Sequence, residues 1–114
     1  MANCVFCQII AQDLPTDFVY ENEKMVVFRD IHPKAEVHLL IVPREHIASL
    51  IDAKVQHGPL IAEMLLLLPK LAKEQGLERG FRTVINTGPG GGQIIDHIHF
   101  HLLGAKHSGY LPKF

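Results

Sequence analysis

Histidine occupies three alternate positions, 97, 99 and 101, in an otherwise apolar stretch near the C-terminus. Side chains at i, i+2 and i+4 of an extended strand share one face, whereas a helix would scatter them. The spacing therefore predicts a strand over 96–104 that carries three imidazoles on one side. The opposite, apolar side of this strand consists of Ile98, Phe100 and Leu102.

These imidazoles would lie roughly 6.6 Å from their neighbours and roughly 13 Å from end to end along the strand. Two adjacent rings can reach one small ligand, but all three cannot easily share one metal ion. Ionisable rings beside a packed apolar face are costly without partners, which favours a chemical role. The alternative is a solvated strand face that happens to be rich in histidine.

Composition narrows the class of protein. The 114 residues fit one domain over 1–114, and 11 basic and 12 acidic side chains intermix without a basic stripe. This pattern argues against nucleic-acid and membrane partners. The first residues lack the features of a signal peptide, so we expect a cytoplasmic protein in which two cysteines are free, metal-bound or redox-active rather than a structural disulfide.

Hydrophobic periodicity and turn residues predict an α+β fold with a five-stranded antiparallel sheet, one short N-terminal helix and one long helix. The third strand should be central, because only His38 interrupts its apolar residues. In the long helix, Pro69 predicts a kink. The predicted helices cover 4–12, capped by Asn3, and 59–75, with a short turn at 47–51. The predicted strands cover 18–21, 25–30, 37–42, 81–87 and 96–104. The predicted buried stripe of the long helix is Ile61, Leu65, Leu68 and Ala72.

A glycine-rich loop, 88–92, leads into the histidine strand. Glycines allow close approach of the backbone to a ligand, and consecutive N–H groups can form an anion-binding concavity. A mobile hairpin loop is the simpler alternative. The position of the loop, directly before the histidines, favours phosphate binding beside them.

Residues 92–104 resemble the signature of the histidine-triad nucleotide-binding proteins, in their hydrolase branch. The resemblance extends over nearly the whole chain and is specific because several upstream blocks match with the triad. These blocks are Phe6 with Ile9 and Ile10, 28–31, Pro33, 38–43, His46 and 86–88.

This resemblance implies a purine nucleoside phosphoramidase-type hydrolase that cleaves AMP-amines or aminoacyl-adenylates. His99 would attack the α-phosphorus and carry the nucleotidyl intermediate, with His101 contacting phosphate and His38 helping to shuttle protons. No cofactor would be required for catalysis. The implied nucleotide contacts are Phe6, Phe28, Asp30, Ile31, Leu40, Asn86, Gly92, Gln93, Ile94, His99 and His101. By pattern alone, Phe28 and Leu40 fit the core equally well, and Asp30 could simply open a turn.

Two departures from the family concern substrate choice. Ile94 stands where many relatives carry a polar residue that contacts the leaving group, and it cannot donate a hydrogen bond. The tail 105–114 follows no transferable pattern. The resemblance also implies a homodimer that joins two sheets through the long helix and the fourth strand, in agreement with the apolar run 64–68.

Cys4 and Cys7 allow several interpretations. A thioredoxin-like motif would need a preceding strand, which is absent from the pattern. Two free thiols packed on a helix are one alternative. The other is half of a structural zinc site that His46 and His97 would complete, as the resemblance suggests. His32, His57 and His107 are expected to be exposed and have no assigned role.

Three other functions remain open from the sequence. One is cleavage of dinucleoside polyphosphates, and another is a nucleotide-binding regulatory module with little turnover. The third is a zinc-binding protein that uses the triad itself as ligands, against which the strand spacing argues.

Overall fold

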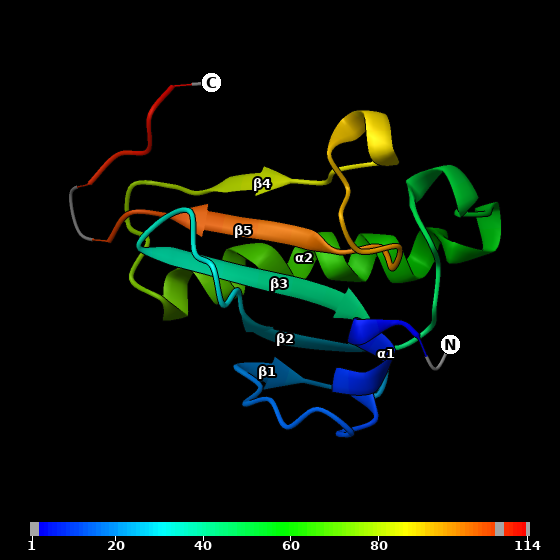
Figure 1. Cartoon of the computed structure of the whole chain (residues 1–114). Helices are drawn as coiled ribbons and strands as arrows, with labels where there is room; N and C mark the ends of the chain where they lie inside the picture. Colours follow the sequence, from blue (N-terminus) through cyan, green and yellow to red (C-terminus); the bar gives the residue numbers. More distant parts are fainter. Residues whose placement is uncertain (1–2, 107–108, 114) are drawn as a thin grey trace.

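A computed structural model describes residues 3–106 and 109–113 and shows one five-stranded antiparallel sheet with a long helix on one face (Figure 1). The strands lie in the order β1-β2-β3-β5-β4, so β3 is central as predicted. They are β1 (Tyr20–Glu21), β2 (Met25–Arg29), β3 (Val37–Pro43), β4 (Arg82–Val84) and β5 (Phe100–Gly104). The helices are α1 (Val5–Ile10) and α2 (Gly58–Glu74), with short 3-10 turns η1 (Leu50–Asp52), η2 (Val55–His57) and η3 (Pro89–Gly91). The predicted α+β architecture is confirmed.

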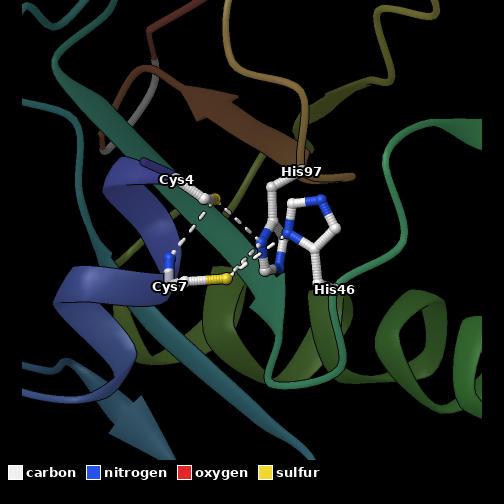
Figure 2. A group of neighbouring side chains, drawn as sticks. All are labelled: Cys4, Cys7, His46 and His97. Carbon is white, nitrogen blue, oxygen red and sulfur yellow. Dashed lines mark hydrogen bonds between the residues drawn. The ribbon is translucent and has the colours of Figure 1, made fainter. Parts of the chain in front are cut away.

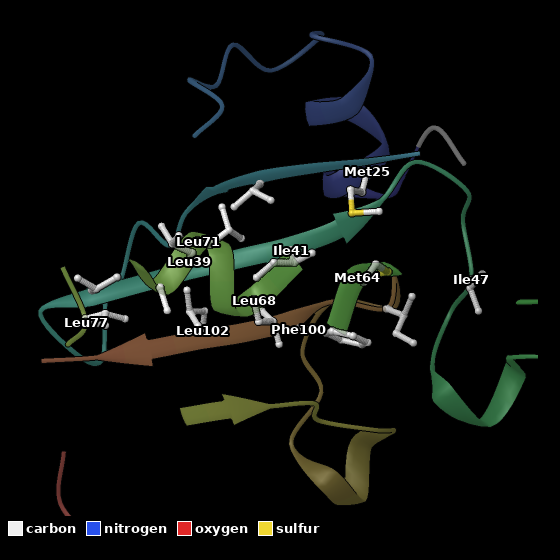
Figure 3. Close-up of a cluster of buried hydrophobic side chains, with 14 residues drawn as sticks. Met25, Leu39, Ile41, Ile47, Met64, Leu68, Leu71, Leu77, Phe100 and Leu102 are labelled. Atoms are coloured by element: carbon white, nitrogen blue, oxygen red, sulfur yellow. The ribbon is translucent and has the colours of Figure 1, made fainter. Parts of the chain in front are cut away.

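The alternation of β3 divides the interior into two layers. Every residue of β3 is buried. Val37, Leu39 and Ile41 pack in the cluster with α2, while Leu40 and Val42 pack on the side of α1. Figure 3 shows the larger cluster, in which side chains of α2 meet those of β3 and β5. Phe100 and Leu102 lie in this cluster with Ile98, as the alternating pattern predicted. The face of β5 that carries His101 is thereby turned away from α2.

The buried face of α2 agrees with the prediction at Leu68 and Ala72, with Ile61 partly buried, and differs from it at Leu65. Met64, Leu68, Leu71 and Ala72 are buried, whereas Leu65 is 41% exposed. Apolar residues follow one another without a gap from 64 to 68, so periodicity alone could not select the inward face. Gly76, with φ of +77°, closes the helix as expected.

The ends of several elements differ from the predictions. The helix α2 continues through Pro69, and a kink at that residue stays a prediction. Cys4, rather than Asn3, caps α1, because its sulfur accepts the Cys7 N–H at 3.4 Å. None of the helices in the described ranges is long and apolar enough to cross a membrane.

The histidine strand begins later than predicted, at Phe100 instead of residue 96. The reason is that the backbone before Phe100 bonds elsewhere: the His97 N–H donates to Ile95 O, and the Ile98 N–H donates to the distant Ile47 O at 2.7 Å. The fourth strand is likewise limited to Arg82–Val84, which pairs with 101–103 of β5. His97 and His99 therefore lie on a connecting segment that backbone hydrogen bonds and side-chain contacts hold in place.

Candidate active site and metal centre

Ile98, Phe100 and Leu102 pack in the larger cluster, as the alternation predicts, while Phe6 of the second cluster contacts both His97 and His99. The His97 ring lies with His46, with 4.8 Å between their centroids. The His99 ring lies 5.0 Å from that of His101, and His101 lies 5.1 Å from His38 across the β3–β5 pair. The rings therefore have different neighbours: His97 lies beside His46, whereas His99 lies beside His101, which in turn lies beside His38.

His99 has one ring nitrogen occupied and the other available. Its Nδ1 lies 2.8 Å from the carbonyl oxygen of His97, so Nδ1 carries the proton and donates it. Burial lowers the pKa of His99, although this hydrogen bond and nearby Asp30 oppose the shift. The ring is therefore neutral near pH 7, with the lone pair on Nε2 as a potential nucleophile.

His38 and His101 form a hydrogen-bonded pair, which we call the His38–His101 pair. The backbone N–H of Lys34 donates to His38 Nδ1 at 3.0 Å, so neutral His38 carries its proton on Nε2. This Nε2–H donates to His101 Nδ1 at 2.8 Å, with Asp30 Oδ2 3.5 Å away. His101 must then carry its own proton on Nε2. The backbone amide of one loop residue thereby sets the tautomer of two rings in series.

The proton at the end of this chain has no acceptor. Within the described residues, His101 Nε2 is the one buried side-chain nitrogen or oxygen without a hydrogen-bond partner. An unpaired buried donor costs roughly 1–3 kcal/mol and calls for an explanation such as a ligand. Burial and the neighbouring rings His99 and His38 lower the pKa of His101 to about 4. His101 is therefore neutral, and its Nε2–H can donate a hydrogen bond to a ligand.

Apolar side chains surround these rings. Phe6 of α1 packs edge-on against His99 at 5.0 Å and against Phe28 at 5.6 Å. Phe6, Phe28 and Leu40 are all buried in the second core cluster, with Val26 and Val42. Their predicted contact with a purine base stays a prediction. Ile31 and Ile94, in contrast, are exposed, and Asn86 is half-buried.

The glycine loop is folded on itself, contrary to the predicted row of free amides. The N–H groups of Gly91 and Gln93 donate to Gly88 O, and that of Gly92 donates to Pro89 O. Gly88 and Gly92 have φ of +70° and +85°, values that favour glycine. Two of the amides expected to face an anion, those of Gly91 and Gly92, are thus used inside the loop.

Gln93 explains how this loop is held. Its side-chain nitrogen donates to Ala48 O at 2.7 Å and Ile95 O at 2.8 Å, and its side-chain oxygen accepts the Gly88 N–H at 2.8 Å. The family resemblance implied a nucleotide contact for Gln93 and did not indicate this anchoring role. Its contact with substrate stays a prediction, as does that of Gly92.

A second group consists of Cys4, Cys7, His46 and His97, which we call the Cys–His cluster (Figure 2). The two cysteines come from the start of α1, and both histidine rings turn toward them. Cys7 Sγ lies 3.3 Å from His46 Nδ1, and His97 Nδ1 lies 3.4 Å from Cys4 Sγ and 3.6 Å from Cys7 Sγ. The predicted joining of these four residues is therefore what the structure shows.

The Cys–His cluster fits a tetrahedral metal ion such as zinc. Zinc bonds of about 2.0–2.3 Å place neighbouring ligand atoms about 3.3–3.8 Å apart, the range of these sulfur–nitrogen distances. His97 Nε2 lies 2.8 Å from Pro43 O and donates its proton there, which leaves the Nδ1 lone pair facing the sulfurs. Burial and Cys4 raise the pKa of the Cys7 thiol, so metal binding would release a proton from it.

The remaining histidines differ in their surroundings. His32 is exposed, as predicted. His57 is half-buried, so the prediction of an exposed ring was wrong, and its Nε2 lies 2.9 Å from a carboxylate oxygen of Glu45. His107 lies outside the described residues.

Comparisons with known proteins agree with this geometry. The family model described as "Scavenger mRNA decapping enzyme C-term binding" matches residues 3–113. Protein HitA of Neisseria gonorrhoeae is 49% identical over 104 residues, which cover 91% of this chain and 97% of the relative. The chain belongs to the histidine-triad family.

Other members of the histidine-triad family carry more specific names. The purine nucleoside phosphoramidase of Escherichia coli K12 is 38% identical, over 92% of this chain and 89% of the relative. The crystal structure of a HIT family hydrolase from Legionella pneumophila superposes with a TM-score of 0.88 at 43% identity, over 97% of this chain and 100% of that one. A zinc-bound histidine-triad protein from Mycobacterium smegmatis has a TM-score of 0.80 at 31% identity, over 95% and 78% of the two chains.

Proposed function

We propose that this histidine-triad protein is a purine nucleoside phosphoramidase-type hydrolase that cleaves AMP-amines or aminoacyl-adenylates. One observation carries the proposal: His99 presents a lone pair on Nε2 beside the unpaired Nε2–H of His101. A nucleophile next to a donor without an acceptor is what phosphoryl chemistry requires. The similarity to a relative named purine nucleoside phosphoramidase supports the same substrate class.

The reaction proceeds in two displacements. In the first, His99 Nε2 attacks the α-phosphorus, the Nε2–P bond forms, and the bond from phosphorus to the amine or acyl oxygen breaks. In the second, water attacks phosphorus, the Nε2–P bond breaks and AMP leaves. The His97 carbonyl oxygen accepts a hydrogen bond from the His99 Nδ1–H in both steps. This bond stabilises the positive charge on the ring as the covalent intermediate forms.

His101 serves the phosphate group. Its Nε2–H donates to a phosphoryl oxygen, where negative charge increases in the transition state. The bound phosphate also raises the pKa of His101, because it supplies the counter-charge that the buried ring lacks. A protonated His101 can then give its Nε2 proton to the departing amine and recover a proton through His38.

The nucleoside is bound by residues around this centre. Asp30 accepts from the ribose hydroxyls, since its Oδ2 faces the site beside His38. Phe6, Phe28, Ile31 and Leu40 contact the purine. The proposed contacts to phosphate or leaving group are Asn86, Gly92, Gln93 and Ile94.

A homodimer and a cytoplasmic location complete the proposal. Leu65 and Leu66 of α2 are 41% and 76% exposed, and β4 lies at the edge of the sheet, which leaves an apolar helix face and a strand edge for a second copy. Light scattering at micromolar concentration tests the dimer, and a monomer would contradict it. Zinc in the Cys–His cluster would supply a structural cross-link and no step of the reaction.

Single-turnover mass spectrometry with an adenosine 5′-phosphoramidate tests the function. We expect a nucleotidyl adduct on His99 and none in His99→Ala, whose turnover falls by several orders of magnitude, on the order of 10⁴-fold or more. AMP affinity should change little, because the ring acts mainly in the transition state. Nucleotide binding without an adduct in the wild type would instead indicate a binding module, and would refute the hydrolase.

A further inference from the structure

The Cys–His cluster lies directly against the side chain to which we assign the nucleophilic role. His97 is both a member of this cluster, through its ring, and the hydrogen-bond acceptor of His99, through its carbonyl oxygen. Phe6 stands between Cys4 and Cys7 in the sequence, and its ring packs edge-on on both His97 and His99, at 5.9 and 5.0 Å. Two separate contacts therefore connect the cluster to the His99 ring.

The backbone at His97 is held by hydrogen bonds and by its side chain together. The peptide unit that contains the His97 carbonyl has one backbone hydrogen bond, from the Ile98 N–H to Ile47 O at 2.7 Å, and the β5 ladder begins only at Phe100, after His97. The His97 ring is completely buried and is fixed at Nε2 by Pro43 O, at the end of β3. Metal coordination at Nδ1 would fix the second nitrogen of this ring and, with it, the carbonyl that orients His99.

Helix α1 packs on the second core cluster through buried Phe6 and partly buried Ile9 and Ile10. It has six residues, too short to be stable alone, and Phe6 is its one buried residue. Cys4 and Cys7 would give it two more attachment points through the metal ion. The ion would thereby hold Phe6 against the edge of the His99 ring.

We infer that a zinc ion in the Cys–His cluster positions His99 for attack, so that metal occupancy controls the rate of the covalent step without contact between metal and substrate. His97 and Phe6 are then positioning residues. This inference rests on the proposed function for its effect on rate, but its effect on the geometry of His99 can be measured independently.

The experiment compares zinc-loaded wild type, chelator-treated wild type and Cys7→Ser, with Ile10→Ala as a matched control. Ile10 packs α1 on the second core cluster but contributes no ligand. Zinc content, the histidine ring-nitrogen NMR signals of His99 and the single-turnover rate with an adenosine 5′-phosphoramidate are measured on each sample.

We expect loss of zinc to slow adduct formation by about 10- to 100-fold, the range typical of a reacting group displaced by a fraction of an ångström to 1 Å. The affinity for AMP should change much less, and the His99 Nδ1–H signal should broaden. Added zinc should restore both properties in the chelator-treated wild type but not in Cys7→Ser, while Ile10→Ala should retain zinc, rate and signal.

Equal rates and equal His99 signals with and without zinc would overturn the inference, as would failure of the wild type to bind zinc. If Cys7→Ser does not fold, the chelator-treated wild type decides the question alone. If no sample forms an adduct but the His99 signal still depends on zinc, the positioning inference stands and the proposed hydrolase is refuted.

Discussion

The Cys–His cluster and the His38–His101 pair both contain histidines, but His97 and His38 differ in which ring nitrogen faces their neighbours. His97 directs an unprotonated nitrogen at its neighbours, whereas His38 directs a protonated one. The possible ligand atoms of the Cys–His cluster lie within 4.8 Å of one another, and so do those of His38, His101 and Asp30. In the cluster, the His97 Nε2–H donates a hydrogen bond to the carbonyl oxygen of Pro43, so the lone pair on His97 Nδ1 faces two sulfurs. In the pair, the backbone N–H of Lys34 donates to His38 Nδ1, so the proton of His38 is on Nε2 and faces His101. Proximity alone would suggest two metal sites, whereas the tautomers indicate one metal site and one donor chain.

Metal stoichiometry gives the most direct way to break this comparison. We expect the wild type to bind one zinc ion and Cys7→Ser to bind it at least about a thousandfold more weakly, since even the loss of an outer hydrogen-bond partner costs up to about 100-fold. His38→Gln should leave the stoichiometry at one. Binding of two ions, the second lost in His38→Gln, would show that the His38–His101 pair is a metal site after all. Competition with a colorimetric chelator measures both quantities.

Substitution of His101 tests the donor assigned to the pair. His101→Ala should lower turnover by about 10²- to 10³-fold, the effect of removing one donor to a developing negative charge. His101→Gln keeps a neutral N–H donor and should lose less. His32→Ala, which changes an exposed ring, is the matched control and should alter turnover less than about twofold. A full rate in His101→Ala would remove this residue from the mechanism.

The pH dependence of stability sharpens the comparison through the same residue. The pKa of His101 is about 4 in the folded protein and about 6.5 when unfolded, so between these values the unfolded chain binds more protons. Its contribution is therefore complete above pH 6.5 and is lost as the pH falls toward 4, by on the order of 3 kcal/mol. Urea unfolding of wild type and His101→Gln measures this contribution, and an equal pH slope in both proteins would contradict it.

Much of the fold follows from local patterns in the sequence. The alternation of Ile98, Phe100 and Leu102 identifies the side of β5 that packs on α2, and the apolar run of β3 identifies the central strand. The resemblance to the histidine-triad family identified the four members of the Cys–His cluster, although their mutual distances required the structure. These features depend on periodicity or on residue type at matching positions, both of which the sequence displays.

Other features depend on backbone hydrogen bonds that no residue pattern announces. Any non-proline residue at position 34 offers an N–H to His38, so the sequence carried no signal for the tautomer of the pair. The start of β5 at Phe100 follows from the Ile98 N–H, which pairs with Ile47, a residue distant in the sequence. Likewise, the glycine-rich composition predicted a loop with free backbone amides. The side-chain amide of Gln93 instead bonds to the Gly88 N–H and holds the loop folded.

This amide of Gln93 joins three segments of the chain, one of which is far from the other two in the sequence. It bonds to the backbone at Ala48, ahead of η1, at Gly88, where the glycine loop starts, and at Ile95, two residues before the first histidine of the triad. Separation of any one of these segments leaves buried polar groups unpaired in the other two, so partial detachment is costly. Local unfolding should therefore release all three segments together as one cooperative unit.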